Sequence, residues 1–229
     1  MKIKAVFFDR DGTLLSGDPD LREALQVKIE GWSGKPYQWP EWDDIVVLRE
    51  RAGFPEGGHK TLDEELAFMP RYWRELLIWA GVSEDLETRT HEVFQMMWLK
   101  NLRLFPETVE VLDWFRSHSI RIGAISNTGP SLPLTLEAVG IDGYFECMIA
   151  SEVVGIRKPD AGIYQIALEA LGVKAEESLF VDDQLRCVEG ARAVGMTAFQ
   201  IDRGQQWGDK EEGCIDSLWS LVEFTKQNS

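Results

Sequence analysis

Acidic and basic side chains follow several apolar segments of the chain, at positions where they could do chemistry together. Asp9 and Asp11 come after the first apolar segment, and Asp182 and Asp183 come after a later one. Carboxylates that share one cleft repel each other, and a bound divalent cation removes that penalty. Oxygen ligands without His or Cys favour a hard ion, Mg²⁺ above others. The four aspartates are therefore our candidate metal ligands.

The same residues could act on a phosphate ester. Asp9, at the end of its apolar segment, could form a covalent aspartyl-phosphate. Asp11, two residues on, could protonate the leaving oxygen and then take a proton from the water that releases the enzyme. Lys158, in a later loop, would supply positive charge to the phosphoryl oxygens. Ser126 and Asn127 follow another apolar segment and add polar groups.

Each of these features alone has a simpler explanation. An Asp-x-Asp turn is usually a solvated turn, and Ser126 with Asn127 is more often a helix cap. Lys158 with Pro159 is an ordinary start of a helix. Only the conjunction of all the groups, each after an apolar segment, makes a purely structural explanation unlikely.

The elements that must position these residues alternate between strand and helix. This alternation indicates an α/β fold, a doubly wound and mostly parallel sheet covered by helices on both faces. In such a sheet, ligands bind beyond the carboxyl ends of the strands. The strands that we expect are Ile3 to Phe8, Ile120 to Ile125, Tyr144 to Ala150, Ser178 to Val181 and Met196 to Ile201. The expected helices are Pro106 to Ser117, Leu132 to Val139, Asp160 to Leu171, one through Gly190, and Ile215 to Lys226.

The stretch from Ser16 to Phe105 differs from the rest of the chain. Its apolar residues recur at helical spacing, and it holds six of the nine tryptophans. We expect helices near residues 21–29, 62–80 and 84–102, with Pro70 breaking or kinking the second. Trp73 and Trp79 should pack between the helices, and His59 should be solvated. The stretch therefore predicts an α-helical domain inserted after the first strand.

Composition narrows the class of partner. The 229 residues include 24 Lys plus Arg and 39 Asp plus Glu, a net charge of −15. This charge disfavours nucleic acid and anionic membranes, which bind basic surfaces, whereas local cations could still attract a small anionic substrate. No apolar run approaches the roughly 18 residues of a membrane span. Three widely spaced cysteines without a zinc pattern favour a reducing, cytoplasmic location.

These groups resemble, in order, the four motifs of the haloacid dehalogenase-like hydrolase superfamily. Residues 7–14, Phe-Phe-Asp-Arg-Asp-Gly-Thr-Leu, resemble the first motif, and Ile125-Ser126-Asn127 the second. Lys158-Pro159-Asp160 resembles the third, and Phe180-Val181-Asp182-Asp183 the fourth. The resemblance covers about residues 1–15 and 105–205. It implies a Rossmann-like catalytic core, residues 1–15 and 106–229, with a helical cap at residues 16–105.

The resemblance also implies a role for each matching residue. Asp9 would be the nucleophile and a Mg²⁺ ligand, and Asp11 the acid and base, with its backbone carbonyl on the metal. Ser126 would hydrogen-bond the phosphoryl group, with Asn127 supporting it, and Lys158 would neutralise the nucleophile and the phosphate.

The fourth motif contains the remaining metal ligands and one departure from the family pattern. Asp182 and Asp183 would hold Mg²⁺, Asp183 the more directly. Many relatives place Asp or Asn four residues after the second acid, where this chain has Cys187. We interpret Cys187 as a small buried side chain on a helix.

The leading hypothesis is a Mg²⁺-dependent phosphatase of a small phosphorylated metabolite, active as a monomer or homodimer. Dehalogenases lack the second carboxylate of the first motif, so Asp11 argues for phosphoryl chemistry. A sugar-phosphate mutase and a phosphonate hydrolase of the same superfamily remain alternatives. From another class, a phospho-accepting signalling protein and a catalytically silent binding module also remain.

Overall fold

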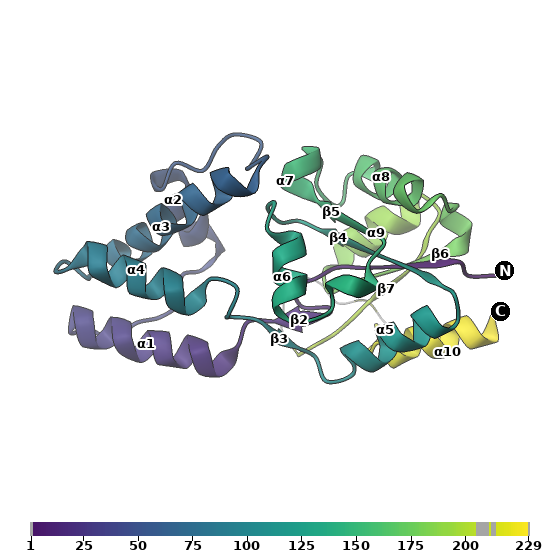
Figure 1. Ribbon diagram of the computed structural model, residues 1–229, viewed down its shortest axis with the longest axis horizontal. Helices are drawn as coiled ribbons and strands as arrows, with labels where there is room; N and C mark the ends of the chain where they lie inside the picture. Colours follow the sequence, from purple (N-terminus) through teal and green to yellow (C-terminus); the bar gives the residue numbers. More distant parts are fainter. Residues whose placement is uncertain (1, 205–210, 212–213, 229) are drawn as a thin grey trace. The chain divides into compact units, whose positions relative to one another are not determined.

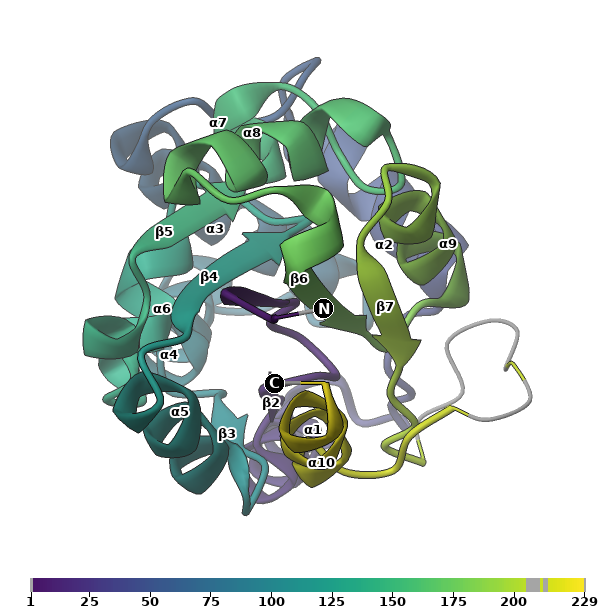
Figure 2. The ribbon, with the colours of Figure 1, turned by 90° about the vertical axis from the view of Figure 1, so that its right-hand side faces the viewer.

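The computed structural model describes residues 2–204, 211 and 214–228, and its centre is a five-stranded parallel sheet. The strand order is β5-β4-β1-β6-β7, and each adjacent pair runs parallel. β1 therefore lies in the middle of the sheet, with β4 and β6 beside it, as Figure 2 shows. The strands are β1 (Ala5–Phe8), β4 (Arg121–Ser126), β5 (Cys147–Ala150), β6 (Ser178–Asp182) and β7 (Thr197–Gln200).

Helices cover both faces of this sheet (Figure 2). Val6 and Phe8 of β1 pack into a core with α5 (Thr108–Ser117), α6 (Leu132–Ala138) and α10 (Trp219–Gln227). The alternate residues, Ala5 and Phe7, pack on the opposite face against α8 (Ala161–Leu171) and α9 (Leu185–Ala193). Side chains alternate between the faces of a strand, so an uninterrupted apolar run marks a strand that is buried on both sides. The predicted doubly wound α/β sheet is confirmed.

The remaining short elements connect these layers. They are α7 (Ser151–Val154) and the 3₁₀ turns η1 (Asp142–Tyr144) and η2 (Ala175–Glu177). A two-stranded antiparallel sheet, β2 (Leu15–Ser16) with β3 (Arg103–Leu104), was not expected. Two-residue strands leave almost no periodicity to detect. This pairing brings together the two segments that flank the inserted helical stretch.

The chain divides into two compact units (Figure 1). The core unit comprises Met1–Ser16 and Arg103–Ser229, and the helical unit comprises Gly17–Leu102. The helical unit has its own apolar core, which includes Leu25, Leu48 and Leu77. Its helices are α1 (Pro19–Ser33), α2 (Trp42–Arg51), α3 (Leu62–Trp79) and α4 (Leu86–Met97). Among the described residues, every helix is too short or too polar to cross a membrane.

The backbone of the helical unit differs from expectation at two places. α3 continues through Pro70 without the expected break, although an interior proline removes one backbone donor. The helix begins with a capping box at Thr61 and Glu64 and buries side chains on both sides of Pro70, such as Phe68 and Leu77, which stabilise it. α2 was not predicted, although its start is marked by acidic residues and a capping box.

Two expectations for aromatic side chains also need correction. Trp73 is buried in the helical unit as predicted, but Trp79 is 38% exposed, and its ring lies edge-on to Tyr37 at 6.2 Å between ring centroids. His59 is buried rather than solvated. The glycine-rich loop Gly53 to His59 places the imidazole ring edge-on to Phe54, at 4.9 Å between ring centroids. Aromatic contacts of this kind favour burial of an imidazole ring.

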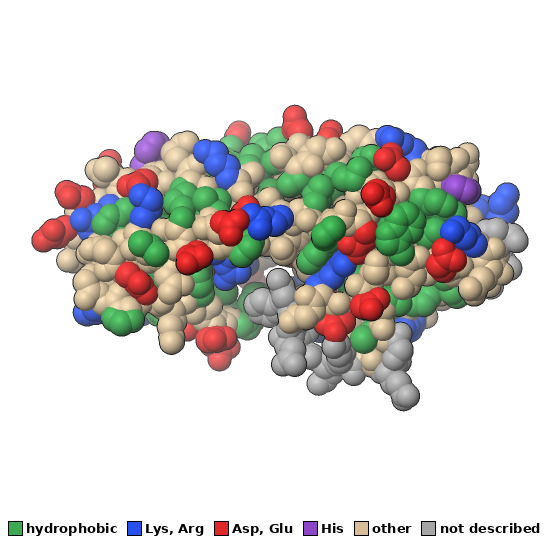
Figure 3. Space-filling view, turned by 90° about the horizontal axis from the view of Figure 1, so that it is seen from below, with side chains coloured by type: hydrophobic (Ala, Val, Ile, Leu, Met, Phe, Trp, Pro, Cys, Tyr) green, Lys and Arg blue, Asp and Glu red, His purple; other side chains and the backbone are tan. Residues whose placement is uncertain are grey.

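Acidic and basic side chains are interspersed on the face of the molecule drawn in Figure 3. On that face the negative charge is spread over the surface and is not gathered into one patch.

Candidate active site

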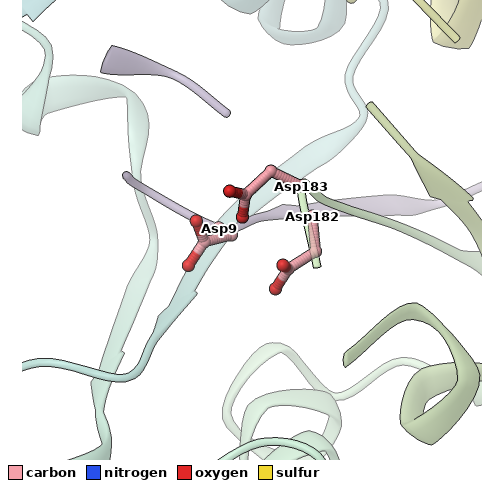
Figure 4. A group of neighbouring side chains, drawn as sticks. All are labelled: Asp9, Asp182 and Asp183. Carbon is pink, nitrogen blue, oxygen red and sulfur yellow. The ribbon is translucent and has the colours of Figure 1, made fainter. Parts of the chain in front are cut away.

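Three aspartates lie close together at the carboxyl ends of β1 and β6. Asp9 directly follows β1, Asp182 is the last residue of β6, and Asp183 comes next. Their carboxylate oxygens lie within 4.8 Å of one another, and Figure 4 shows the three side chains together. The backbone N–H of Asp9 donates to the carbonyl of Val181 at 2.9 Å. This bond continues the parallel ladder by one residue and fixes Asp9 beside β6.

Lys158 connects two of these carboxylates. Its Nζ lies 2.6 Å from Oδ1 of Asp9 and 2.6 Å from Oδ2 of Asp182, and the residue is only 2% exposed. Taking charges out of water costs several kcal/mol for each ion unless good pairing compensates. The ammonium between two carboxylates provides that pairing and fixes one oxygen of Asp9.

Asn127 holds the backbone of Lys158. Its side-chain Oδ1 accepts from the N–H of Lys158 at 2.8 Å, and its Nδ2 donates to the carbonyl of Lys158 at 3.0 Å. The Asn127 amide therefore bonds the backbone of Lys158 at both polar groups, and its support of a phosphoryl ligand stays a prediction. Asp160 caps α8, accepting from Gly162 N–H at 2.8 Å.

Ser126 is the last residue of β4, the strand next to β1, and it is buried. The alternative that Ser126 and Asn127 cap a helix is wrong, because the following helix α6 has Ser131 at its N-cap. Ser126 therefore lies at the same edge of the sheet as Asp9 and Asp182.

The electrostatics of the acidic cluster favour a cation. Burial raises the pKa of Asp9, Lys158 opposes this effect, and the charges of Asp182 and Asp11 add to it. Burial, followed by the charges of Asp9 and Asp182, raises the pKa of Asp183 to about 8. Neighbouring carboxylates that resist ionisation in this way are stabilised by a bound positive ion.

Asp182 and Asp183 differ in the hydrogen-bond partners of their carboxylate oxygens. Asp182 uses Oδ1 to accept from the N–H of Gln184 at 2.8 Å and Oδ2 to bind Lys158. Oδ1 of Asp183 is buried without a hydrogen-bond partner. A buried, unpartnered carboxylate oxygen is costly, and a cation would satisfy it. The donor set therefore fits a hard divalent ion, with Asp183 better placed than Asp182 to hold it directly.

Gly12 allows the loop after β1 to approach Asp183. It has a φ of +75°, and a Cβ there would lie 2.6 Å from Oδ2 of Asp183. The loop is closed by a bond from Gly12 N–H to the carbonyl of Leu15 at 2.8 Å. Any side chain at this position would combine an unfavourable backbone conformation with a clash against the carboxylate.

Asp11 lies outside the group of three carboxylates and is bound by Arg10, a residue that the sequence analysis missed. Arg10 donates from Nε to Oδ1 of Asp11 at 3.1 Å and from Nη2 to Oδ2 at 2.6 Å. A cation between two candidate catalytic acids was the available signal in the sequence.

Cys187 is buried on α9 as predicted, and burial, more than any nearby charge, raises the pKa of its thiol to about 12.

Comparisons with known proteins find similar sequences and structures. A family model described as haloacid dehalogenase-like hydrolase matches residues 3–195. A phosphatase of Mycobacterium tuberculosis is 28% identical over 228 residues, with 96% of each chain covered. A phosphoserine phosphatase of Thermus thermophilus is 29% identical over 237 residues, with 91% of this chain and 92% of the relative covered.

The fold is shared with solved structures as well. A 2-haloacid dehalogenase from Pseudomonas syringae superposes with a TM-score of 0.65 at 24% identity, covering 99% of this chain and 100% of the other. At this identity the likeness shows the fold alone, so the reaction must be argued from the side chains.

Proposed function

Because the chain belongs to the haloacid dehalogenase-like hydrolases, we propose that it is a phosphatase of small phosphorylated metabolites that acts through an aspartyl-phosphate. The observation that carries the proposal is the buried contact of Lys158 with Asp9, at 2.6 Å, beside the other two aspartates. The relatives named phosphatases support the reaction class. We keep as part of the proposal that the core unit is catalytic and that the helical unit is its cap.

In the proposed reaction Asp9 is the nucleophile. One of its oxygens attacks phosphorus, and the bond between phosphorus and the leaving oxygen breaks as Asp11 protonates that oxygen. Water then attacks phosphorus, and Asp11 takes the proton of the water. The bond from Asp9 to phosphorus breaks, which restores the carboxylate and releases phosphate.

Two further residues of the strand ends assist the proposed reaction. Lys158 holds Oδ1 of Asp9 and neutralises charge on the nucleophile and on the phosphate. Ser126, at the end of β4, donates to a phosphoryl oxygen. Asn127 acts through Lys158, whose backbone it fixes at both polar groups.

Mg²⁺ is the cofactor that we propose, because the ligands are oxygens and include no thiolate or imidazole. Asp9, Asp183 and the backbone carbonyl of Asp11 would hold the ion, with Asp182 beside it. When bound, it would lend positive charge to a phosphoryl oxygen. The buried Oδ1 of Asp183 without a partner supports this assignment.

The alternatives have less support. The carboxylate of Asp11 argues against dehalogenation, which needs no proton donor for the leaving halide. A phosphonate hydrolase would need a buried cap lysine, whereas the candidates Lys28, Lys35 and Lys60 in the helical unit are all exposed. A mutase would share the residues described here and differ in the fate of the phosphoryl group. The complete set of Asp9, Asp11 and Lys158 argues against a silent binding module.

The decisive experiment is phosphate release from an aryl phosphate and from a panel of phosphorylated metabolites, with Mg²⁺ present. Release supports the phosphatase, and its absence across the panel contradicts it. A mutase would instead transfer the phosphoryl group to a second hydroxyl, which chromatography of the products would reveal.

Metal removal tests the cofactor separately. Activity should disappear in excess chelator and return with Mg²⁺ but not with Ca²⁺. Ca²⁺ takes six to eight oxygens at about 2.3–2.6 Å and could recruit both oxygens of Asp9. Undiminished release in chelator, or full activity with Ca²⁺, would show that this assignment is wrong.

Location and assembly belong to the same proposal. Cys147, Cys187 and Cys214 are all free thiols in the structure, which supports a reducing, cytoplasmic setting. We propose a monomer or homodimer that binds its small phosphorylated substrate and neither nucleic acid nor membrane.

A further inference from the structure

We propose that Arg10 is a positioning residue that sets the orientation of the Asp11 carboxylate and thereby controls proton transfer to the leaving group. This inference rests on the proposed function, in which Asp11 is the acid and base. It adds a role for a residue that neither touches the phosphoryl group nor holds the metal in that scheme.

The first observation is the geometry of the contact. Two donors of one guanidinium, Nε and Nη2, reach the two oxygens of the Asp11 carboxylate at 3.1 and 2.6 Å. A forked pair of this kind fixes both the position and the plane of a carboxylate, which a single contact cannot do. The orientation of Asp11 is therefore set by Arg10.

The second observation is that Arg10 is itself anchored on a different part of the core unit. Its Nη1 donates to Oγ1 of Thr135 at 2.9 Å, and its Nη2 donates to Oγ1 of Thr128 at 3.1 Å. Thr135 belongs to α6, and Thr128 to the loop that follows β4. The guanidinium thus connects the side chain of Asp11 to these two segments of the core unit by hydrogen bonds.

The backbone around Arg10 is fixed as well. Its carbonyl accepts the N–H groups of Leu14 at 2.9 Å and Leu15 at 3.1 Å. These bonds hold the backbone of the loop, and the fork to Arg10 holds the Asp11 side chain that the loop carries.

The third observation is that the side chains of Arg10 and Asp11 differ in their exposure to solvent. The side chain of Arg10 is 11% exposed, whereas that of Asp11 is 60% exposed. An ion pair with one partner in water adds little stability, and burying a guanidinium has a cost. Here the buried cation holds an acid that stays accessible to solvent and to a ligand.

The test compares two classes of substrate. Replacing Arg10 with leucine should lower kcat/KM for alkyl phosphates, whose leaving groups need a proton, by about 10- to 100-fold, the scale of a misplaced catalytic group. This parameter reports the steps up to departure of the leaving group and leaves out hydrolysis of the aspartyl-phosphate, which both classes share. Aryl phosphates leave without a proton, so their kcat/KM should change by less than about threefold. Equal losses on both classes would reduce Arg10 to a structural role and overturn the inference.

A second variant keeps the charge and removes the fork. Lysine at position 10 offers one point charge and cannot bind both carboxylate oxygens in a plane. Arg10→Lys should therefore show a loss of the same kind as Arg10→Leu, biased toward alkyl phosphates. Full activity of Arg10→Lys on alkyl phosphates would overturn the inference, because charge alone would then be sufficient. This variant also keeps the test valid if Arg10→Leu fails to fold.

Asp11→Asn separates this inference from the proposed function. It should reproduce the bias toward alkyl phosphates, and adding Arg10→Leu to it should cause little further loss, because both act on one proton transfer. If Asp11→Asn shows no bias, the acid and base role in the proposed function fails. If Asp11→Asn shows the bias and the two Arg10 variants do not, only the role of Arg10 is wrong.

Arg116→Leu is the matched control. Arg116 also pairs with an aspartate, Asp113 at 2.7 Å, but on the exposed surface of α5. Its replacement should leave the ratio of alkyl to aryl turnover unchanged. Thermal unfolding of each variant, measured by circular dichroism, confirms that the compared proteins are folded.

Discussion

The core unit buries ion pairs between segments far apart in the sequence, whereas the ion pairs described in the helical unit lie on its surface. In the core unit, Lys158 is buried against Asp9, 149 residues away. In the helical unit, Lys28 and Glu92 are 2.7 Å apart, with side chains 42% and 45% exposed. Buried pairs contribute little net stability. The core unit also has exposed pairs, such as Arg116 with Asp113. We infer that its buried pairs place atoms, whereas the pairs described in the helical unit lie at the solvent boundary.

A second buried pair supports this comparison. Arg203 and Glu107 lie 2.6 Å apart, with side chains 7% and 13% exposed. Arg203 also donates to the carbonyl of Thr13 at 2.8 Å, in the loop that carries Asp9 and Asp11. Glu107 accepts the backbone N–H of Leu218 at 3.2 Å. The pair therefore ties the loop after β1 to the start of α5 and to the segment before α10.

The largest effect is expected from Asp9→Asn. The substitution is nearly isosteric but removes the nucleophile, so turnover should fall by more than about a thousandfold while the fold remains. Phosphate release and circular dichroism are the measurements. Asp142→Asn is the control, because Asp142 is exposed in the 3₁₀ turn before β5, at the opposite end of the strands. Activity of Asp9→Asn within tenfold of the parent would contradict the covalent mechanism.

Lys158→Met should abolish most activity and also destabilise the core unit. Removing one partner of a buried pair typically costs about 3–5 kcal/mol, because the other charge is left uncompensated. Urea unfolding would measure this loss in the free energy of unfolding.

A double variant distinguishes placement of charge from simple packing. Adding Asp182→Asn to Lys158→Met removes one of the two stranded carboxylates, so part of the lost stability should return while activity stays low. If the double variant is no more stable than Lys158→Met, the pairing of Lys158 with Asp182 is not what holds this site together.

The same contrast explains what could be predicted from the sequence. The sheet was predictable because its strands are apolar on both faces, and the site because parallel strands end at one edge. The place of Arg10 between two candidate catalytic acids was visible in the sequence, but its anchoring on Thr135 was not, because Thr135 lies 125 residues away. Arg203 was not, because Thr13 lies 190 residues away.

The helical unit was harder to predict for a different reason. α2 has a single buried residue, Leu48, and its two valines, Val46 and Val47, are 39% and 43% exposed. Its apolar pattern is therefore weak. His59 is buried by aromatic contacts that depend on the path of a glycine-rich loop. Tertiary packing decides both features, and neither leaves a periodic signal in the sequence.

Glu107→Gln should show a smaller effect that depends on pH. Burial favours the neutral acid, but hydrogen bonds from Arg203 and from backbone N–H groups outweigh it and lower the pKa of Glu107 below its usual 4.5. A lowered pKa stabilises the fold above the unfolded value, and this contribution is lost as pH falls. Near pH 7 the variant should lose about 2 kcal/mol, the scale of a charged hydrogen bond.

The gap between parent and Glu107→Gln should narrow as pH falls below about 4.5, the ordinary value for this carboxyl group. Urea unfolding across this range provides the measurement. Glu223→Gln, which removes an exposed partner of Lys226, is the control and should show a much smaller gap at neutral pH. A gap for Glu107→Gln that stays constant with pH would mean that its charge is not the stabilising feature.

The smallest effect is expected from the exposed pair of the helical unit. Lys28 and Glu92 join α1 to α4, and a double-mutant cycle with Lys28→Met and Glu92→Gln should give a coupling energy below about 1 kcal/mol. Methionine keeps much of the apolar stem of Lys28, whose Nζ lies 5.8 Å from the centroid of the Trp32 ring. The coupling should weaken further in high salt, because exposed charges are screened. A coupling as large as that of the buried pairs would remove the contrast between the two units, since the helical unit would then also use charge to fix its structure.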